Sequence, residues 1–339
     1  MIPEEKGRSG SAAKVPIGVI LLNLGGPDSL DAVEPFLYNL FSDPDIITLP
    51  FGFQWLVPFL AMWISKRRAK IARKYYTLIG GRSPLRELTE SQRADLEKAL
   101  SEQGNYRVFV GMRYWNPAIE EAVDQALALG IKKLIALPLF PQYSVTSSGS
   151  ALNELNRVLE RKKASLKVVP VLEWYNHPGY LQAMAENIEA AKKMFPPGEE
   201  GEIHLLFSAH GVPEKVIQKG DPYQKQIEET VRLVEERIPG KKQIHLAYQS
   251  RVGRLKWIGP SVEEKLKELA AKKVRKLLVV PVSFVSDHSE TLYEIDILFR
   301  DRAKELGIPY FVRMPSLNSS PTFIRALKEI VAGRNGGTA

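Results

Sequence analysis

Two segments of the chain resemble each other so closely that they align without a gap. NPAIEEAVDQALALGIKKLIALP begins at Asn116, and GPSVEEKLKELAAKKVRKLLVVP begins at Gly259. Their matched prolines and Glu-Glu pairs have the same separation along the chain. Self-similarity of this kind indicates two copies of one structural unit, and a cleft between such copies is a favoured place for a ligand.

Apolar runs of strand length recur in both halves and alternate with segments of helical period. The first half has them at residues 17–24, 107–111, 133–140 and 167–171, and the second at residues 203–208, 243–248, 276–283 and 309–313. They are rich in Val, Ile and Leu, which is typical of parallel strands covered by helices on both faces. The sequence therefore predicts an α/β fold of two similar doubly wound, Rossmann-like domains with parallel sheets and a cleft between them.

The length of 339 residues suits two domains. We expect a disordered tail at residues 1–15, an N-terminal α/β domain at 16–172 and a C-terminal α/β domain at 173–316. We expect residues 317–333 to form a helix that packs back on the N-terminal domain. The first residues lack the apolar core of a secretion signal, which predicts a cytoplasmic protein.

Composition excludes several kinds of site. The chain has no cysteine, so thiolate nucleophiles, zinc–thiolate sites and cysteine-ligated iron–sulfur clusters are excluded, and any transition metal must meet nitrogen and oxygen ligands. The formal net charge of +8 fits nucleic acid, anionic lipid or a small acidic ligand. Because the basic residues gather beside one apolar run and not along a broad stripe, nucleic acid is the least favoured of these partners.

That apolar run predicts a lip at about residues 51–76. Residues 51–64 are nearly all apolar and include Trp55 and Trp63, and a basic stretch with Arg67 and Arg68 follows. The run is too short to span a bilayer, which needs about 20 residues. We expect the lip to bind a flat apolar ligand that bears carboxylates, to rest on anionic lipid, or to do both. The alternative is a buried helix followed by a solvated basic one.

Titratable residues follow two predicted strands of the second half. His210 ends the run that begins at residue 203, and the segment after the run at 276–283 contains Asp287, His288, Glu290 and Glu294. The carboxyl ends of parallel strands share one edge of a sheet, where ligands bind, so we expect these side chains to converge. Asp287, three residues before Glu290, also fits a capping box for a helix that begins there.

His210 with Glu290 is suited to proton transfer near neutral pH or to binding a divalent metal. Two protein ligands are too few for a structural metal site. The pattern therefore favours a metal that is passed on, and it leaves open whether His210 is a general base or a metal ligand.

Eight motifs resemble those of the ferrochelatase family, the terminal enzymes of haem synthesis, in order and near spacing. They are LLNLGGP, GMRYWNP, PQYS, LFSAHGVP, GDPY, QSRVGRLKWIGP, SFVSDHSETLYEID and SLN. The resemblance implies two Rossmann-like domains around a porphyrin cleft, and insertion of Fe(II) into protoporphyrin IX with release of two pyrrole protons. The absence of cysteine makes the chain similar to the cluster-free bacterial members.

The resemblance also implies roles for individual residues. His210 and Glu290 match the family's catalytic histidine and acidic residue, and both are expected to contact the metal. Further polar positions on the same side of the family's porphyrin cleft match Asp287, His288 and Glu294. Positions around the macrocycle match Arg113, Tyr143, Ser144, Trp257 and Phe284, and positions near the porphyrin carboxylates match Tyr76, Ser83, Arg67 and Arg68.

The expected partners are therefore a porphyrin and ferrous iron as substrates, with no tightly bound cofactor and no nucleic acid. Contact of the lip with the anionic inner membrane is a further expectation, and no oligomeric partner is evident. Two rival functions remain. A cobalt chelatase of vitamin B12 synthesis would share the architecture but use a more hydrophilic tetrapyrrole, and a haem carrier would bind without catalysis.

Overall fold

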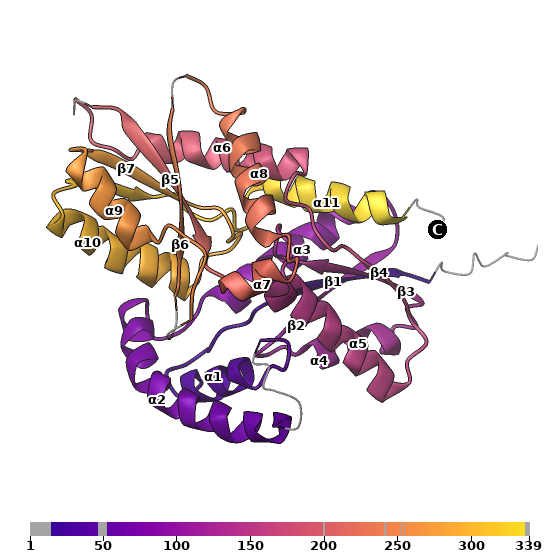
Figure 1. Ribbon diagram of the computed structural model, residues 1–339. Coiled ribbons are helices and arrows are strands. Elements are labelled where there is room, and N and C mark those ends of the chain that lie inside the picture. The colour runs from indigo at the N-terminus through magenta and orange to yellow at the C-terminus, as the bar shows by residue number, and fades with distance from the viewer. Residues whose placement is uncertain are drawn as a thin grey trace, which may run out of the picture.

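The computed structural model describes residues 15–46, 53–198, 201–240, 242–251, 253 and 255–335. The predicted tail, except Val15, and the first two residues of the predicted lip lie outside these ranges. Within them the chain forms two four-stranded sheets with helices on both faces (Figure 1). The predicted α/β class with two similar halves is confirmed.

Both sheets have the same strand order, and every pairing in them is parallel. The first sheet has the order β2-β1-β3-β4 and contains β1 (Ile17–Asn23), β2 (Tyr106–Met112), β3 (Lys133–Pro138) and β4 (Lys167–Pro170). The second has the order β6-β5-β7-β8 and contains β5 (Ile203–His210), β6 (Gln243–Gln249), β7 (Lys276–Pro281) and β8 (Tyr310–Arg313). Each strand lies on an apolar run of the sequence, and the two central strands of each sheet, β1 and β3 or β5 and β7, are mostly buried.

The repeat in the sequence is also a repeat in the structure. Helices α4 (Ile119–Ala128) and α9 (Val262–Ala271) occupy equivalent positions after the second strand of each sheet. After the third strand, each half has a π-helical segment that runs into an α-helix: η2 (Val145–Gly149) leads to α5 (Ser150–Lys162), and η3 (Glu290–Phe299) leads to α10 (Arg300–Glu305). Such turns are rare and frequently lie at functional sites.

The inner faces of the two sheets share one hydrophobic core. It contains Val19 and Ile135 of the first sheet together with Leu205 and Leu278 of the second. The helices that contribute to it are α3 (Leu85–Leu100), α6 (Pro178–Lys192), α8 (Tyr223–Glu235) and α11 (Pro321–Asn335). The outer face of each sheet has a separate cluster under α4 and α5 or under α9 and α10.

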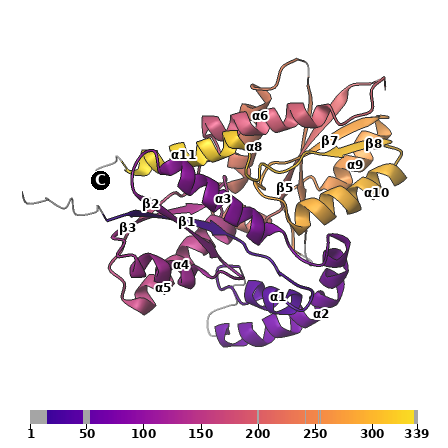
Figure 2. The same cartoon turned by 180° about the vertical axis from the view of Figure 1, so that it is seen from behind.

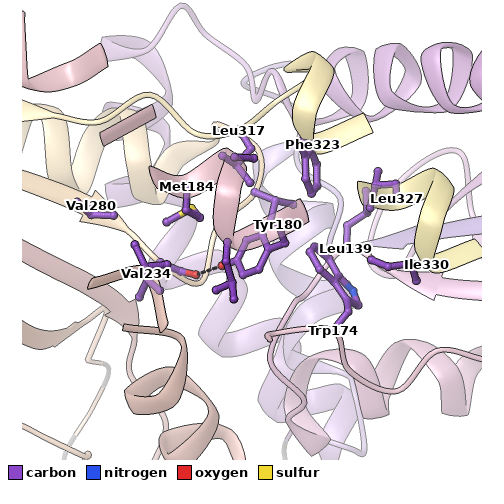
Figure 3. Packing of buried hydrophobic residues seen from close by; sticks show 14 of the residues in the cluster. Leu139, Trp174, Tyr180, Met184, Val234, Val280, Leu317, Phe323, Leu327 and Ile330 are labelled. Atoms are coloured by element: carbon purple, nitrogen blue, oxygen red, sulfur yellow. Dashed lines mark hydrogen bonds between the residues drawn. The ribbon is translucent and has the colours of Figure 1, made fainter. Parts of the chain in front are cut away.

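Helices α6 and α11 connect the halves. Although α6 follows β4 of the first sheet, it contacts β7 of the second, and α11 contacts α3 and β3 of the first half. The two helices lie side by side in Figures 1 and 2. Figure 3 shows Phe323 of α11 near Trp174 and Tyr180. The Tyr180 hydroxyl donates a hydrogen bond to the Val282 carbonyl at 3.0 Å. The two halves are therefore joined by packed side chains and not by a linker alone.

Helices α1 (Val33–Phe41) and α2 (Val57–Leu78) pack against each other at one side of the first half (Figure 1). The face of α2 toward the protein is formed by small residues, among them Ala61, Ser65 and Ala69. The opposite face, with the short helix η1 (Gln54–Leu56), exposes large apolar side chains: Phe53, Trp55, Phe59, Met62 and Trp63. No helix in the described ranges is long and apolar enough to cross a bilayer.

Candidate active site

His210 and Glu290 face each other at the carboxyl edge of the second sheet. His210 is the last residue of β5, and Glu290 begins η3, which follows the neighbouring strand β7. The Nε2 atom of His210 lies 3.4 Å from Oε1 of Glu290. The side chains remain 38% and 27% exposed, so both are accessible to a ligand.

Three contacts fix the orientation of His210. Its backbone N–H donates to Ser283 Oγ at 2.9 Å, and its carbonyl accepts a hydrogen bond from the Tyr223 hydroxyl at 2.9 Å. Its Nδ1 lies 2.6 Å from the Gly211 carbonyl oxygen, so Nδ1–H is the donor there. The other nitrogen, Nε2, is left to face Glu290.

The charges of this pair stabilise each other. Burial disfavours the charged imidazole, but the Glu290 carboxylate outweighs burial and raises the pKa of His210 to about 9. Burial alone would raise the pKa of Glu290, whereas attraction to His210 and His288 lowers that pKa well below the usual range. At neutral pH the pair is therefore an imidazolium next to a carboxylate.

Glu290 lies between two imidazoles. The Nε2 atom of His288 is 3.6 Å from the second carboxylate oxygen of Glu290, and His288 Nδ1 is 3.0 Å from the Ser286 carbonyl oxygen. Phe284 meets both rings, with its centroid 6.3 Å from that of His210 and 4.8 Å from that of His288. An aromatic surface thus adjoins the two imidazoles and the carboxylate.

Glu294 is held by the end of β6. Its carboxylate accepts hydrogen bonds from the Ser250 N–H at 2.8 Å, the Ser250 hydroxyl at 2.5 Å and Gln249 Nε2 at 3.1 Å. Burial and the nearby Glu290 charge raise the pKa of Glu294 despite these donors. Glu294 therefore binds a proton more readily than an ordinary glutamate.

The predicted capping box between Asp287 and Glu290 is wrong. The helix begins at Glu290 after Ser289, and the Ser289 side chain makes no capping hydrogen bond. Asp287 instead accepts hydrogen bonds from Arg313 at 2.8 Å, Asn318 at 3.0 Å and Thr291 at 3.0 Å. Burial would raise the pKa of Asp287, but the charge of Arg313 together with the hydrogen bonds that the carboxylate accepts outweighs burial and lowers it. Arg313 is the last residue of β8. The Asp287 carboxylate therefore binds a side chain of a neighbouring strand and not the start of the helix, as the local pattern had predicted.

On the first half, Arg113 is bound within the protein. Its Nη2 lies 2.9 Å from Oδ1 of the fully buried Asp43, its Nε donates to Ser150 Oγ at 2.8 Å, and its side chain is only 11% exposed. Asp43 also accepts a hydrogen bond from the Tyr114 hydroxyl at 2.5 Å. Most of the guanidinium is thus used to order the end of β2.

The PQYS motif lies against the second half. Tyr143 is half-buried, and its N–H donates to Gln226 Oε1 at 2.7 Å. Ser144 is buried, and its hydroxyl donates to Asp221 Oδ2 at 3.0 Å. The hydroxyl that sequence comparison places at the macrocycle therefore already has a protein partner.

The end of α2 meets η3. Tyr76 is buried, which raises its pKa to about 12, and its hydroxyl donates to Ser289 Oγ at 3.3 Å. The neighbouring Tyr75 stacks on Tyr293 with ring centroids 4.2 Å apart. These contacts join the predicted lip to the segment that contains Glu290.

The remaining predicted residues are more dispersed. Arg67 and Arg68 are exposed on α2, and the Arg67 guanidinium lies 5.4 Å from the Trp63 ring centroid. Ser83 is buried, and Trp257 is half-buried and pairs through its backbone with Pro213. A surface groove of about 550 Å³ lies between α1 and α2, and neither His210 nor Glu290 lines it.

Sequence reasoning missed Asp43, Asp221, Gln249 and Ser250. Asp221 lies in the GDPY motif, and Gln249 and Ser250 are the first two residues of QSRVGRLKWIGP. These motifs marked the segments, but they did not indicate what the three side chains do. No sequence motif marked Asp43, because its partner Arg113 is distant in the sequence. Within the described ranges, no group of three or more His, Cys, Asp or Glu residues is arranged to hold a metal ion.

Known proteins are similar to this chain over most of its length. The family model Ferrochelatase matches residues 16–335. A ferrochelatase of Aquifex aeolicus is 51% identical over 315 residues, which are 93% of this chain and 98% of the relative. A ferrochelatase of Geotalea daltonii is 49% identical over 94% of this chain and 98% of its own length.

Among solved structures, SirB from Bacillus subtilis with Fe³⁺ covers 95% of this chain and 96% of its own, with a TM-score of 0.55. At 12% identity this likeness shows the fold alone. The family model spans both sheets, and the two bacterial relatives share about half of their aligned residues with this sequence. The chain therefore belongs to the ferrochelatase family.

Proposed function

We propose that the protein inserts Fe(II) into protoporphyrin IX to give protohaem, with release of two protons, as the last step of haem synthesis. Ferrochelatases are metal-chelating lyases, and this chain is a member of their family. The observation that carries the proposal is the pair of His210 and Glu290, 3.4 Å apart and accessible at the carboxyl edge of the second sheet. An imidazole and a carboxylate at such an edge suit both a divalent metal and proton transfer.

Insertion requires the porphyrin to bend, to lose two pyrrole protons and to receive a cation that sheds its water. Distortion of about 1 to 5 kcal/mol is within what remote binding contacts supply. The imidazolium form of His210 must release its proton before Nε2 receives a pyrrole proton or binds the incoming iron. Glu294 is the neighbouring carboxyl that suits this release, because its pKa is raised.

The exposed apolar face of α2 supports a porphyrin as the substrate. Trp63 and Phe59 are 60% and 61% exposed, and the basic residues Arg67 and Arg68 are exposed beside them. We propose that this face contacts the macrocycle edge and the anionic membrane, while the two arginines attract the porphyrin carboxylates. A cytoplasmic protein that touches the inner membrane through α2 is the arrangement we propose.

The direct test is an anaerobic assay with purified protein, Fe(II) and protoporphyrin IX. Porphyrin fluorescence should disappear as haem absorption appears. His210→Ala should reduce the rate by at least about a hundredfold, on the scale of a lost acid–base group, while porphyrin still binds. His245→Ala, at the other end of the sheet, is the matched control and should keep the normal rate. Near-normal turnover in His210→Ala would contradict the assignment.

A cobalt chelatase acting on a more hydrophilic tetrapyrrole is the competing function. The solved neighbours include a SirB sirohydrochlorin chelatase in complex with cobalt, but at 10% identity. The exposed aromatic residues of α2 favour an apolar porphyrin over that substrate. Rates with Fe(II) and Co(II), each offered protoporphyrin and sirohydrochlorin, separate the two functions.

A further inference from the structure

Asp221 links the two halves of the molecule. It stands just before α8 and is buried, with 8% of its surface exposed. Its Oδ2 accepts hydrogen bonds from the Ser144 hydroxyl at 3.0 Å and from the Val145 N–H at 2.8 Å. Its Oδ1 accepts a third from the Tyr223 N–H at 3.0 Å. One carboxylate therefore holds the start of η2 in the first half and the start of α8 in the second.

The same face of α8 makes further contacts with the loop after β3. Gln226 accepts a hydrogen bond from the Tyr143 N–H at 2.7 Å, and Gln142 donates to Thr230 Oγ1 at 3.1 Å. Gln226 and Thr230 are buried. Four consecutive residues, 142 to 145, are thus attached to α8 or to Asp221 just before it.

Tyr223 connects this helix to the other side of the site. It is buried, and its hydroxyl donates to the His210 carbonyl at 2.9 Å. Asp221 and Tyr223 are two residues apart in the GDPY motif. Through them, the loop containing Tyr143 and the strand end containing His210 are fixed to the same helical turn.

The chemistry at Asp221 requires a carboxylate. Both donors to Oδ2 point at one oxygen, and a buried carboxylate offers acceptors only. An asparagine in that position would leave an NH₂ group facing N–H and O–H donors, or would give up the contact with Tyr223. The charge also lies at the amino end of α8, where the helix dipole favours an anion.

We infer that Asp221 and Tyr223 are positioning residues that set the distance between His210 and the Tyr143 loop, and so align a bound porphyrin with the metal-inserting pair. The inference rests on the proposed function. Displacement of reacting groups by about 1 Å can cost about a hundredfold in rate, so a fixed link between the two sides would affect turnover more than affinity.

Tyr223→Phe is the sharpest variant, because it removes one hydroxyl and keeps the buried ring. We expect kcat for Fe(II) insertion to fall about tenfold or more, with the porphyrin dissociation constant within about threefold of the wild type. Asp221→Asn should also lower kcat while leaving the porphyrin dissociation constant nearly unchanged, and its fall in kcat should be larger. Tyr106→Phe is the matched control: this tyrosine is also buried, and its hydroxyl has a partner, Asn335, at 2.9 Å, but it begins β2 far from the site.

If these residues had a purely structural role, the variants would lower the free energy of unfolding without lowering kcat more than porphyrin affinity. The inference is wrong if Tyr223→Phe keeps the wild-type kcat, if its loss is no greater than that of Tyr106→Phe, or if kcat and porphyrin affinity fall together. Urea unfolding of each variant confirms that the rates refer to folded protein.

A second measurement does not depend on activity. The chain has no cysteine, so Val145→Cys and Leu298→Cys provide unique sites for two spin labels. Both side chains are exposed, and Val145 contributes only its backbone N–H to Asp221. Asp221→Asn should broaden the label-to-label distance distribution, and Tyr106→Phe should not. An unchanged distribution overturns the inference, whereas failure of the wild type to insert iron would overturn only the proposed function.

Discussion

At the residue scale, Glu290 determines the chemistry of the site. One of its oxygens faces His210 at 3.4 Å and the other faces His288 at 3.6 Å, while its carbonyl accepts a hydrogen bond from Gln249 at 3.2 Å. Its negative charge offsets the cost of a charged, partly buried imidazole. The proton that His210 holds at neutral pH is therefore a property of the pair.

Replacing Glu290 by Gln should lower the pKa of His210 from about 9 toward the ordinary value of about 6.5. The attraction is lost while the burial that disfavours the charged ring stays. An NMR titration of the imidazole signals measures the change, and Glu186→Gln on the exposed face of α6 is the control. A value that stays near 9 in Glu290→Gln would mean that another group holds the proton.

The other end of the same sheet has a histidine pair with the opposite behaviour. His204 Nδ1 lies 3.0 Å from His245 Nε2, so one ring donates a hydrogen bond to the other. Burial, then His204 and Lys265, lower the pKa of His245 to about 4, and burial lowers that of His204. Both rings titrate near 6.5 in the unfolded chain.

Because the unfolded state binds these protons more tightly, this pair costs no stability above about pH 6.5 and lowers the stability of the folded protein as the pH falls toward 4. His245→Gln should reduce that loss by about 1 kcal/mol, a value discounted for partial exposure. Urea unfolding at pH 7.5 and pH 5 measures it. Equal losses in variant and wild type would contradict this account.

At the element scale, α2 has two faces of different composition. Ala61 and Ala69 are 0% and 1% exposed toward the protein, whereas Trp63 is 60% exposed. Small residues bring α2 close to α1, and the large side chains project outward. The described part of the apolar run, residues 53–64, is therefore neither a fully buried helix nor a membrane span, but η1 and the start of the amphipathic helix α2.

Two substitutions on α2 should separate these faces. Ala69→Leu should destabilise the protein by about 1 to 3 kcal/mol, because the added carbons have no space against α1. Trp63→Ser should change stability by less than about 0.5 kcal/mol and weaken porphyrin binding. Urea unfolding and fluorescence titration give the two quantities. A stability loss in Trp63→Ser equal to that in Ala69→Leu would show that the indole is structural.

The sequence predicted elements better than it predicted contacts between them. Each strand followed an apolar run, because burial on both faces leaves a local pattern. The π-helical turns of η3 were not predicted, since their apolar spacing is close to that of an α-helix. Asp287 was assigned to a cap because its partner Arg313 comes from another strand, and Asp43 was missed because Arg113 lies far along the chain.

At the scale of the whole molecule, one hydrophobic core contains residues of both halves, so we expect the halves to unfold together. Trp174, Tyr180 and Phe323 lie in the cluster that also contains residues of both sheets. The rings of Trp174 and Phe323 are 5.9 Å apart, so α11 is packed directly against the segment between the sheets. Loss of the contact between Trp174 and Phe323 should therefore destabilise both halves of the molecule.

Phe323→Ala should therefore lower the free energy of unfolding by about 3 to 5 kcal/mol. The fluorescence signal that is lost on Trp115→Phe in the first half and the signal that is lost on Trp257→Phe in the second, with Trp174 kept, should report one shared transition. Arg325→Ala, exposed on the same helix, is the control and should change stability by less than about 0.5 kcal/mol. Two separate transitions would mean that the halves unfold independently.

The position of α11 also constrains how the protein is made. A ribosome releases the amino-terminal half first, and domains usually fold as they emerge. Here the groove between α3 and α6 is filled by residues 321–335, which are translated after both sheets. A nascent chain that ends before them leaves the surface around Trp174 and Tyr180 open to water, a surface of the kind that chaperones bind. Completion of the first half thus waits until α11 has been translated.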